Sequence, residues 1–159
     1  TYETQLLQYI ENKPYEQGHG IYKYFKDSYE VTHLETKQKY IGKKVLFFER
    51  NKRLGKRALE ALRLERKAKG IGGRTPAKQK IITESDWVSY FGSHLKIKEL
   101  LKRDGPLAFS KKIIQYVPNK KQLTYFECKH LFINEVLDSR NNYINDNILG
   151  KFYRKDFNL

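Results

Sequence analysis

Sulfur-containing residues are nearly missing from this 159-residue chain, which has one cysteine, Cys128, and no methionine. A single cysteine cannot build a disulfide framework or a cysteine-based zinc site, so both classes are excluded. It also favours a reducing compartment, and we expect a cytoplasmic protein. No apolar run approaches the roughly 18 residues of a membrane span and no signal peptide is visible, so we expect no membrane partner.

Acidic residues are scarce relative to basic ones: 18 Asp and Glu stand against 32 Lys and Arg, a net charge of +14. The segment from Lys43 to Lys80 holds fourteen Lys or Arg and three Glu, which is +11 of that total. Aromatic residues make up 14% of the chain, too many for a disordered basic tail. The composition therefore predicts a folded protein with a polyanionic partner, nucleic acid before an anionic membrane surface.

Apolar periodicity predicts a small α/β fold. Strands are expected over residues 29–33, from 39 to 42 and beyond as the second arm of a hairpin, and over 109–117. Helices are expected over 56–69, from a start at 83–86, over 93–103 and over 121–137. We therefore predict a three-stranded antiparallel sheet flanked by helices, with a basic helical insertion.

A set of polar residues recurs at characteristic spacing. Tyr40-Ile41-Gly42 begins eleven residues after Tyr29, Arg50 comes ten residues after Tyr40, Glu127 lies within the last predicted helix, and Asn145 follows it. Over residues 27–146 this pattern resembles the GIY-YIG nuclease superfamily, in particular its phage-encoded, homing-endonuclease-like branch. The resemblance implies a metal-dependent DNA endonuclease, with a free-standing phage homing enzyme as its most specific form and the host cytoplasm as its location.

The resemblance also implies catalytic roles. Glu127 would hold one divalent ion, Mg²⁺ or Mn²⁺, and Arg50 would bind the scissile phosphate. Tyr29 or Tyr40 would orient or deprotonate the attacking water. Lys43 would assist by favouring the phenolate form. Because Glu127 sits in an apolar run, we expect it either to point outward or to meet a cation.

Further positions lie outside this catalytic set. Gly42, Asn145 and His33 are expected to have structural roles or to contact substrate. The literal string Gly20-Ile21-Tyr22 leaves Tyr22 as an alternative to Tyr29 for the first motif. Many members carry a histidine where this chain has Leu54, and His33 is the first candidate to replace it. His130, one helical turn after Glu127, is the second candidate.

The basic segment from Lys43 to Lys80 is interpreted as a DNA-contacting insertion, because it directly follows the predicted hairpin that carries Tyr29 and Tyr40. Its predicted DNA contacts are Lys44, Lys52, Arg53, Lys56, Arg57, Arg63, Arg66, Lys67 and Arg74. The predicted organisation is an N-terminal extension over 1–26, a nuclease domain over 27–146 with an insertion at 51–82, and a tail over 147–159. Double-stranded DNA is the expected partner, with a homodimer on DNA as one arrangement. The alternative hypothesis is a catalytically inactive basic DNA-binding protein that keeps the fold.

Overall fold

The computed structural model describes residues 26–157, so Tyr22 and nearly all of the expected N-terminal extension lie outside the described residues. The described chain forms two compact units, each of which is considered by itself. The first unit contains residues 26–46 and 85–157, and the second contains Phe47–Glu84. Within the described residues, every helix is too short or too polar to cross a membrane.

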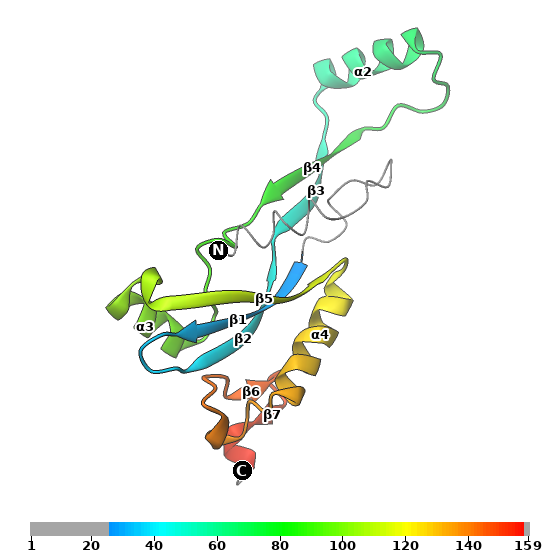
Figure 1. The fold of residues 1–159 in the computed structure, drawn as a ribbon. Coiled ribbons are helices and arrows are strands. Elements are labelled where there is room, and N and C mark those ends of the chain that lie inside the picture. The colour runs from blue at the N-terminus through cyan, green and yellow to red at the C-terminus, as the bar shows by residue number, and fades with distance from the viewer. Residues whose placement is uncertain (1–25, 158–159) are drawn as a thin grey trace. The chain divides into compact units, whose positions relative to one another are not determined.

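The first unit is built on the predicted three-stranded antiparallel sheet, in the order β2–β1–β5 (Figure 1). Its strands are β1 (Lys26–His33), β2 (Lys39–Val45) and β5 (Phe109–Val117). In the β1–β2 register Tyr29 lies opposite Gly42 and Val31 lies opposite Tyr40. The central strand β1 is hydrogen-bonded to a strand on each side, whereas β2 lies at an edge of the sheet and pairs with a strand on one side only.

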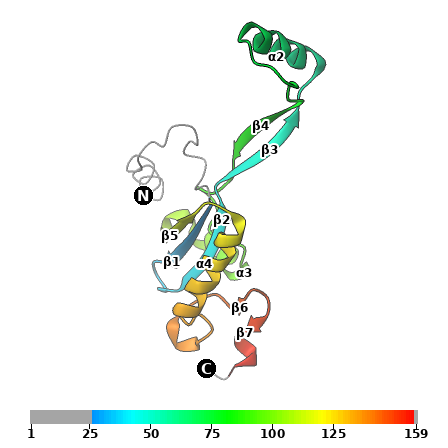
Figure 2. The same cartoon turned by 90° about the vertical axis from the view of Figure 1, so that its right-hand side faces the viewer.

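Two helices cover the two faces of this sheet, α3 (Leu95–Asp104) and α4 (Lys120–Ile133) (Figure 2). Tyr40 packs in one core with residues of α3, and the next residue, Ile41, packs in the other core with Leu131 of α4. Since consecutive strand residues point to opposite faces, the two helices lie on opposite sides of β2. The small α/β fold with helices flanking the sheet is therefore confirmed.

The helix boundaries differ from the prediction in two places. α4 ends at Ile133 rather than residue 137, because Glu135 adopts a positive φ of 46° and turns the chain. Val136 and Leu137 reach the core from beyond this turn, and Ile133 is 65% exposed. The helix start expected at 83–86 is wrong, since its first two residues end a strand and residues 87–89 form a turn.

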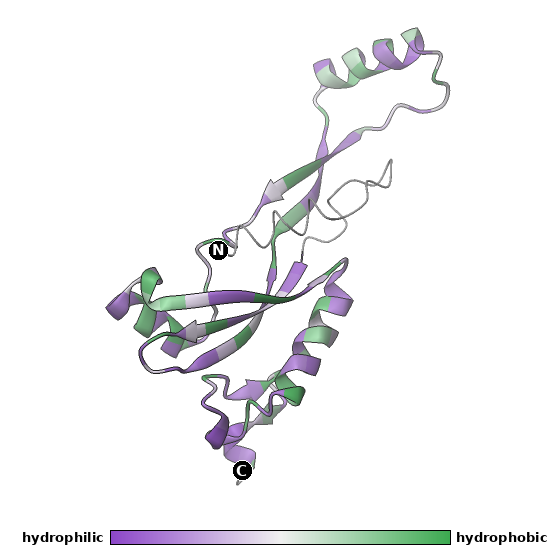
Figure 3. Cartoon of the chain, viewed as in Figure 1, coloured by the Kyte–Doolittle hydropathy of each residue, from purple (hydrophilic) through white to green (hydrophobic). Residues whose placement is uncertain are grey.

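The second unit contains a two-stranded hairpin that the sequence analysis did not predict. Strands β3 (Phe47–Arg53) and β4 (Lys78–Glu84) pair antiparallel, and the predicted basic helix α2 (Lys56–Ala68) connects them. β3 lacks the apolar alternation of a half-buried strand because nearly all of its residues are exposed. No residue of α2 is buried, and Figure 3 shows hydrophilic and hydrophobic stretches alternating along α2 and its two strands.

Residues beyond α4 return to the sheet. A short 3₁₀ turn over Pro106–Ala108 precedes β5. Two more such turns follow α4, over Ser139–Asn141 and Arg154–Asp156. Between the last two, β6 (Asn147–Ile148) and β7 (Phe152–Tyr153) form a small hairpin. Ile148 is 2% exposed and packs in the core with Ile41, so the hairpin is anchored in the first unit.

Candidate active site

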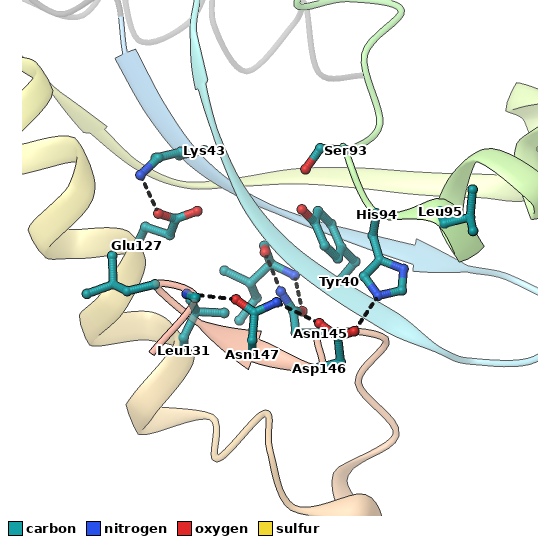
Figure 4. Close-up of a pocket in the computed structure, with 13 residues that line it drawn as sticks. Tyr40, Lys43, Ser93, His94, Leu95, Glu127, Leu131, Asn145, Asp146 and Asn147 are labelled. Atoms are coloured by element: carbon teal, nitrogen blue, oxygen red, sulfur yellow. Dashed lines mark hydrogen bonds and ion pairs between the residues drawn. The ribbon is translucent and has the colours of Figure 1, made fainter. Parts of the chain in front are cut away.

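The free edge of β2 borders a pocket of about 650 Å³ within the first unit. Four residues singled out in the sequence line it together: Tyr40, Lys43, Glu127 and Asn145 (Figure 4). They come from β2, from α4 and from the segment before β6. Because the pocket lies at a strand edge, side chains from both faces of the sheet reach it.

Asn145 closes part of the open edge of β2. Its Oδ1 accepts a hydrogen bond from the Ile41 backbone N–H at 2.9 Å, and its Nδ2 donates to the Ile41 carbonyl at 2.8 Å. The amide therefore supplies the donor and acceptor that a neighbouring strand would supply. Just before it, the Ile144 N–H donates to the Lys39 carbonyl at 2.7 Å. Asn145 is 7% exposed, so this bonding fixes both the residue and the strand edge.

Glu127 meets a cation, one of the two outcomes expected from its apolar neighbours. The Lys43 Nζ lies 2.8 Å from the Glu127 Oε2 and donates to the Thr124 hydroxyl at 3.2 Å. The Glu127 side chain is 16% exposed, which is open enough for an ion to reach the carboxylate from the pocket. The lysine after Gly42 thus holds the carboxylate in place at the pocket wall.

Tyr29 and Tyr40 converge on Gly42. A Cβ atom at Gly42 would lie 2.7 Å from the Tyr29 hydroxyl oxygen and 2.9 Å from the Tyr40 Cε1, so only glycine leaves room for both rings. Gly92, with a φ of 149°, meets the same Tyr40 ring edge, where a Cβ would lie 2.7 Å from Cε1. Tyr40 lines the pocket, whereas Tyr29 is 1% exposed and is not among the residues that line it.

The expected lowering of the tyrosine pKa values is not found. Burial, followed by the neighbouring tyrosines and the charges of Asp27 and Glu127, raises the pKa of Tyr29. Burial likewise raises the pKa of Tyr40 and outweighs the lowering by its hydrogen bond with Ser93. Both phenols are therefore protonated at neutral pH in this structure.

His94 lines the pocket but was given no role in the sequence analysis, although it directly follows Gly92-Ser93. Its ring lies 6.3 Å from the Tyr40 ring, centroid to centroid. The Lys96 backbone N–H donates to its Nδ1 at 3.1 Å, which caps α3. The neutral ring then carries its proton on Nε2, which lies 3.4 Å from the Asp146 Oδ2. The available signal was its position directly after Gly92-Ser93, although the predicted helix over 93–103 placed it within the first helical turn.

His33 is placed away from the pocket. It is fully buried, its Nε2 lies 2.9 Å from the Asp104 Oδ2, and its Nδ1 lies 2.8 Å from the Thr36 hydroxyl. Glu35 completes a group of possible metal ligands there, but Arg103 pairs with Asp104 at 2.6 Å. The cluster therefore ties the β1–β2 turn to the end of α3, and His33 has a structural role.

The other histidine candidate also lies outside the pocket lining. His130 is half-buried on α4, and burial lowers the pKa of its ring. His130 is not among the residues that line the pocket, so its role as a replacement for the family histidine stays a prediction. His94 is the histidine that the fold places beside Tyr40.

The predicted phosphate and DNA contacts fall mainly on the second unit. Arg50 is exposed on β3, with its guanidinium 5.8 Å from the Phe48 ring centroid, so its role at the scissile phosphate stays a prediction. Lys44 differs from the other basic candidates, because its ammonium pairs with Asp86 at 2.6 Å and its side chain is 15% exposed. Arg66 donates to the Gly72 carbonyl at 2.8 Å. The exposed candidates are Lys52, Arg53, Lys56, Arg57, Arg63, Lys67 and Arg74.

Comparison with known proteins agrees with this geometry. A family model described as "Putative endonuclease segE, GIY-YIG domain" matches residues 9–148. No curated protein and no solved structure matches the chain. The match covers well over half of the chain and includes all four pocket residues predicted from the resemblance. The chain therefore belongs to the GIY-YIG endonuclease family, in its phage-type segE branch.

Proposed function

We propose that this chain is a metal-dependent endonuclease that hydrolyses phosphodiester bonds of double-stranded DNA. The observation that carries the proposal is the convergence of Tyr40, Lys43, Glu127 and Asn145 on one pocket. These residues are separated by up to 105 positions in sequence, yet they meet at one strand edge, within a chain that belongs to an endonuclease family.

The pocket residues fit a hard divalent cation. Glu127 presents a partly exposed carboxylate to the pocket, and Asp146 adds a second one from the opposite wall. Carboxylate oxygen suits Mg²⁺ or Mn²⁺, which keep most of their remaining coordination positions for water and phosphate. When bound at Glu127, such an ion would supply charge stabilisation at the phosphate. Lys43 would then share the Glu127 carboxylate with the ion, or move to the phosphate oxygens.

Tyr40 acts in this proposal as a protonated phenol. Its raised pKa leaves the hydroxyl as a hydrogen-bond donor at neutral pH, so it positions the water or a phosphate oxygen instead of removing a proton. Gly42 and Gly92 hold one edge of the ring, and Ser93 bonds to the hydroxyl. Tyr29 is assigned to the first motif because it lies opposite Gly42 and packs in the same core cluster as Tyr40.

The second unit is proposed to bind the DNA backbone. Its helix α2 has no buried residue, so its cations are available to phosphates along its whole length. Exposed Lys and Arg that neutralise phosphates release counterions and give salt-dependent affinity. We retain the nuclease domain over 27–146 with its insertion at 51–82, and assign Arg50 to the scissile phosphate. A second copy of the chain, bound to the same duplex, would supply the second cut.

The proposal is tested by incubating supercoiled plasmid with the purified chain and Mg²⁺ or Mn²⁺. We expect nicked or linear product that is abolished by EDTA. The variants Glu127→Gln and Tyr40→Phe should each lower the cleavage rate by about 100-fold or more. Matched controls are Glu99→Gln, an exposed acid on α3, and Tyr125→Phe, an exposed tyrosine on α4. Both controls should cut at the wild-type rate.

Two other outcomes would contradict the proposal. Equal cleavage by wild type, Glu127→Gln and Tyr40→Phe would identify a contaminating nuclease. DNA binding that persists in EDTA, without cleavage under any metal, would favour the catalytically inactive DNA-binding protein. If the proposal holds, a phage homing role in the host cytoplasm predicts cutting at a restricted set of sequences, which sequencing of the product ends would reveal.

A further inference from the structure

Arg154 makes an unusual set of contacts for a residue outside the expected nuclease domain. Its Nη2 lies 2.7 Å from the Val136 carbonyl oxygen, 2.8 Å from that of Tyr143 and 2.6 Å from that of Asn145. Its backbone N–H donates to the Asp146 carbonyl at 2.8 Å. Carbonyls that converge on one cation are held at fixed separations, so the guanidinium organises the segment between α4 and β6.

One of these contacts leads directly to the pocket. The Asn145 carbonyl is held by Arg154, while the Asn145 side-chain amide bonds to the backbone N–H and carbonyl of Ile41. Ile41 lies between Tyr40 and Gly42. A displacement of the Asn145 backbone would therefore break the hydrogen bonds at Ile41, the residue next to Tyr40, and free this part of the β2 edge.

The same residue holds a wall of the pocket. The hairpin of β6 and β7 contributes Asn147, Leu149 and Gly150 to the lining, and Arg154 follows β7 directly. The turn carries strain, because Leu149 has a φ of 58° in a region that disfavours branched side chains. The Arg154 backbone N–H donates to the Asp146 carbonyl and closes the base of this hairpin, while the guanidinium holds the Asn145 carbonyl just before β6.

We propose that Arg154 is a positioning residue of the active site, and that it acts by holding the Asn145 carbonyl and the pocket-wall hairpin. The residue lies beyond position 148, where the family match ends, and within the segment predicted to be a tail. The inference rests on the proposed nuclease function for its catalytic consequence, but its structural consequence, the fixed Asn145–Ile41 contact, does not require cleavage.

The test compares the full-length variants Arg154→Ala and Arg154→Lys with Lys155→Ala, which removes the same charge one position away. In Arg154→Ala we expect the Ile41 amide to lose hydrogen-exchange protection while Val31, in the centre of the sheet, keeps it. The kcat for plasmid cleavage should fall roughly ten- to hundredfold, because the pocket loosens. The DNA dissociation constant should stay within about twofold, since α2 is untouched.

Two further arms separate positioning from general stability. Arg154→Lys should retain part of both readouts, because the ammonium reaches fewer carbonyls, and Lys155→Ala should match the wild type. The double variant Arg154→Ala/Asn145→Ala should lose no more activity than Asn145→Ala, because both residues act on one contact.

The proposal would be overturned by Ile41 protection and kcat at wild-type levels in Arg154→Ala. Loss of Val31 protection in both Arg154 variants would also overturn it, because Arg154 would then stabilise the whole unit. Additive losses in the double variant would remove the link to Asn145. If the wild-type chain cuts no DNA, the proposed function fails, and the exchange of the Ile41 amide still decides whether Arg154 holds Asn145.

Discussion

Gly42 is the position where a single added methyl group should disturb the site most. In Gly42→Ala the new Cβ would lie 2.7 Å from the Tyr29 hydroxyl oxygen, 2.8 Å from the Tyr29 Cζ and 2.9 Å from the Tyr40 Cε1. Tyr29 has little room to withdraw because it is 1% exposed, and Tyr40 could move only toward the pocket that it lines. Gly92 already meets the same edge of the Tyr40 ring. The strand or both rings must therefore shift.

Such overpacking costs about 1–3 kcal/mol of unfolding free energy. For a chain of this size, a loss of about 2 kcal/mol lowers the melting temperature by about 4–8 °C. The assay is urea unfolding followed by fluorescence of Trp87, the single tryptophan, which is 3% exposed in the same unit. Gly72→Ala is the matched control, because a Cβ at Gly72 meets nothing within 4 Å.

A Gly42→Ala protein that unfolds at the wild-type urea concentration would refute this reasoning. The double variant Gly42→Ala/Tyr29→Phe adds a check, because phenylalanine lacks the oxygen that makes the closest contact. It should recover part of the stability that Gly42→Ala loses, measured relative to Tyr29→Phe alone. No recovery would mean that the clash with Tyr29 is not the cause.

Three further predictions concern other regions. Leu149→Asn should raise the unfolding free energy by about 1 kcal/mol, because asparagine before glycine tolerates the positive φ of this turn; an unchanged urea midpoint would contradict it. Burial lowers the pKa of Lys111 to about 8, whereas the unfolded lysine titrates near 10.5. Between these values only the unfolded state binds the proton, so wild-type stability should rise with pH relative to Lys111→Met, and a flat difference would argue against it. Replacing Arg57, Arg63 and Lys67 by glutamine should reduce the salt slope of DNA binding by about 3, as a filter-binding titration would show.

Local patterning made the central sheet predictable. The alternation around Tyr29 and Val31 marks a half-buried strand, and the polar turn after His33 marks a hairpin, so the antiparallel pairing follows. The strands β3 and β4 were not predictable in this way. Phe47–Arg53 is exposed almost throughout. Since neither face of the strand is buried, its sequence does not alternate between apolar and polar residues.

The site was predictable in part for a related reason. Tyr40, Lys43, Glu127 and Asn145 were found because their spacing resembles a family pattern, and all four line the pocket. His94 was missed because the predicted helix over 93–103 included it, whereas the structure makes it the N-cap of α3. The raised pKa of Tyr40 could not be predicted, because its burial depends on side chains from distant elements that one sequence does not bring together.

The bond between Asn145 and Ile41 joins residues 104 positions apart. Such a contact closes one of the longest loops in the chain, and it forms only after residues from beyond α4 are available. During synthesis, β1 and β2 are made long before Asn145, and the Arg154 contacts come later still. A nascent or truncated chain that ends before this segment can therefore pair its early strands while the candidate site is incomplete.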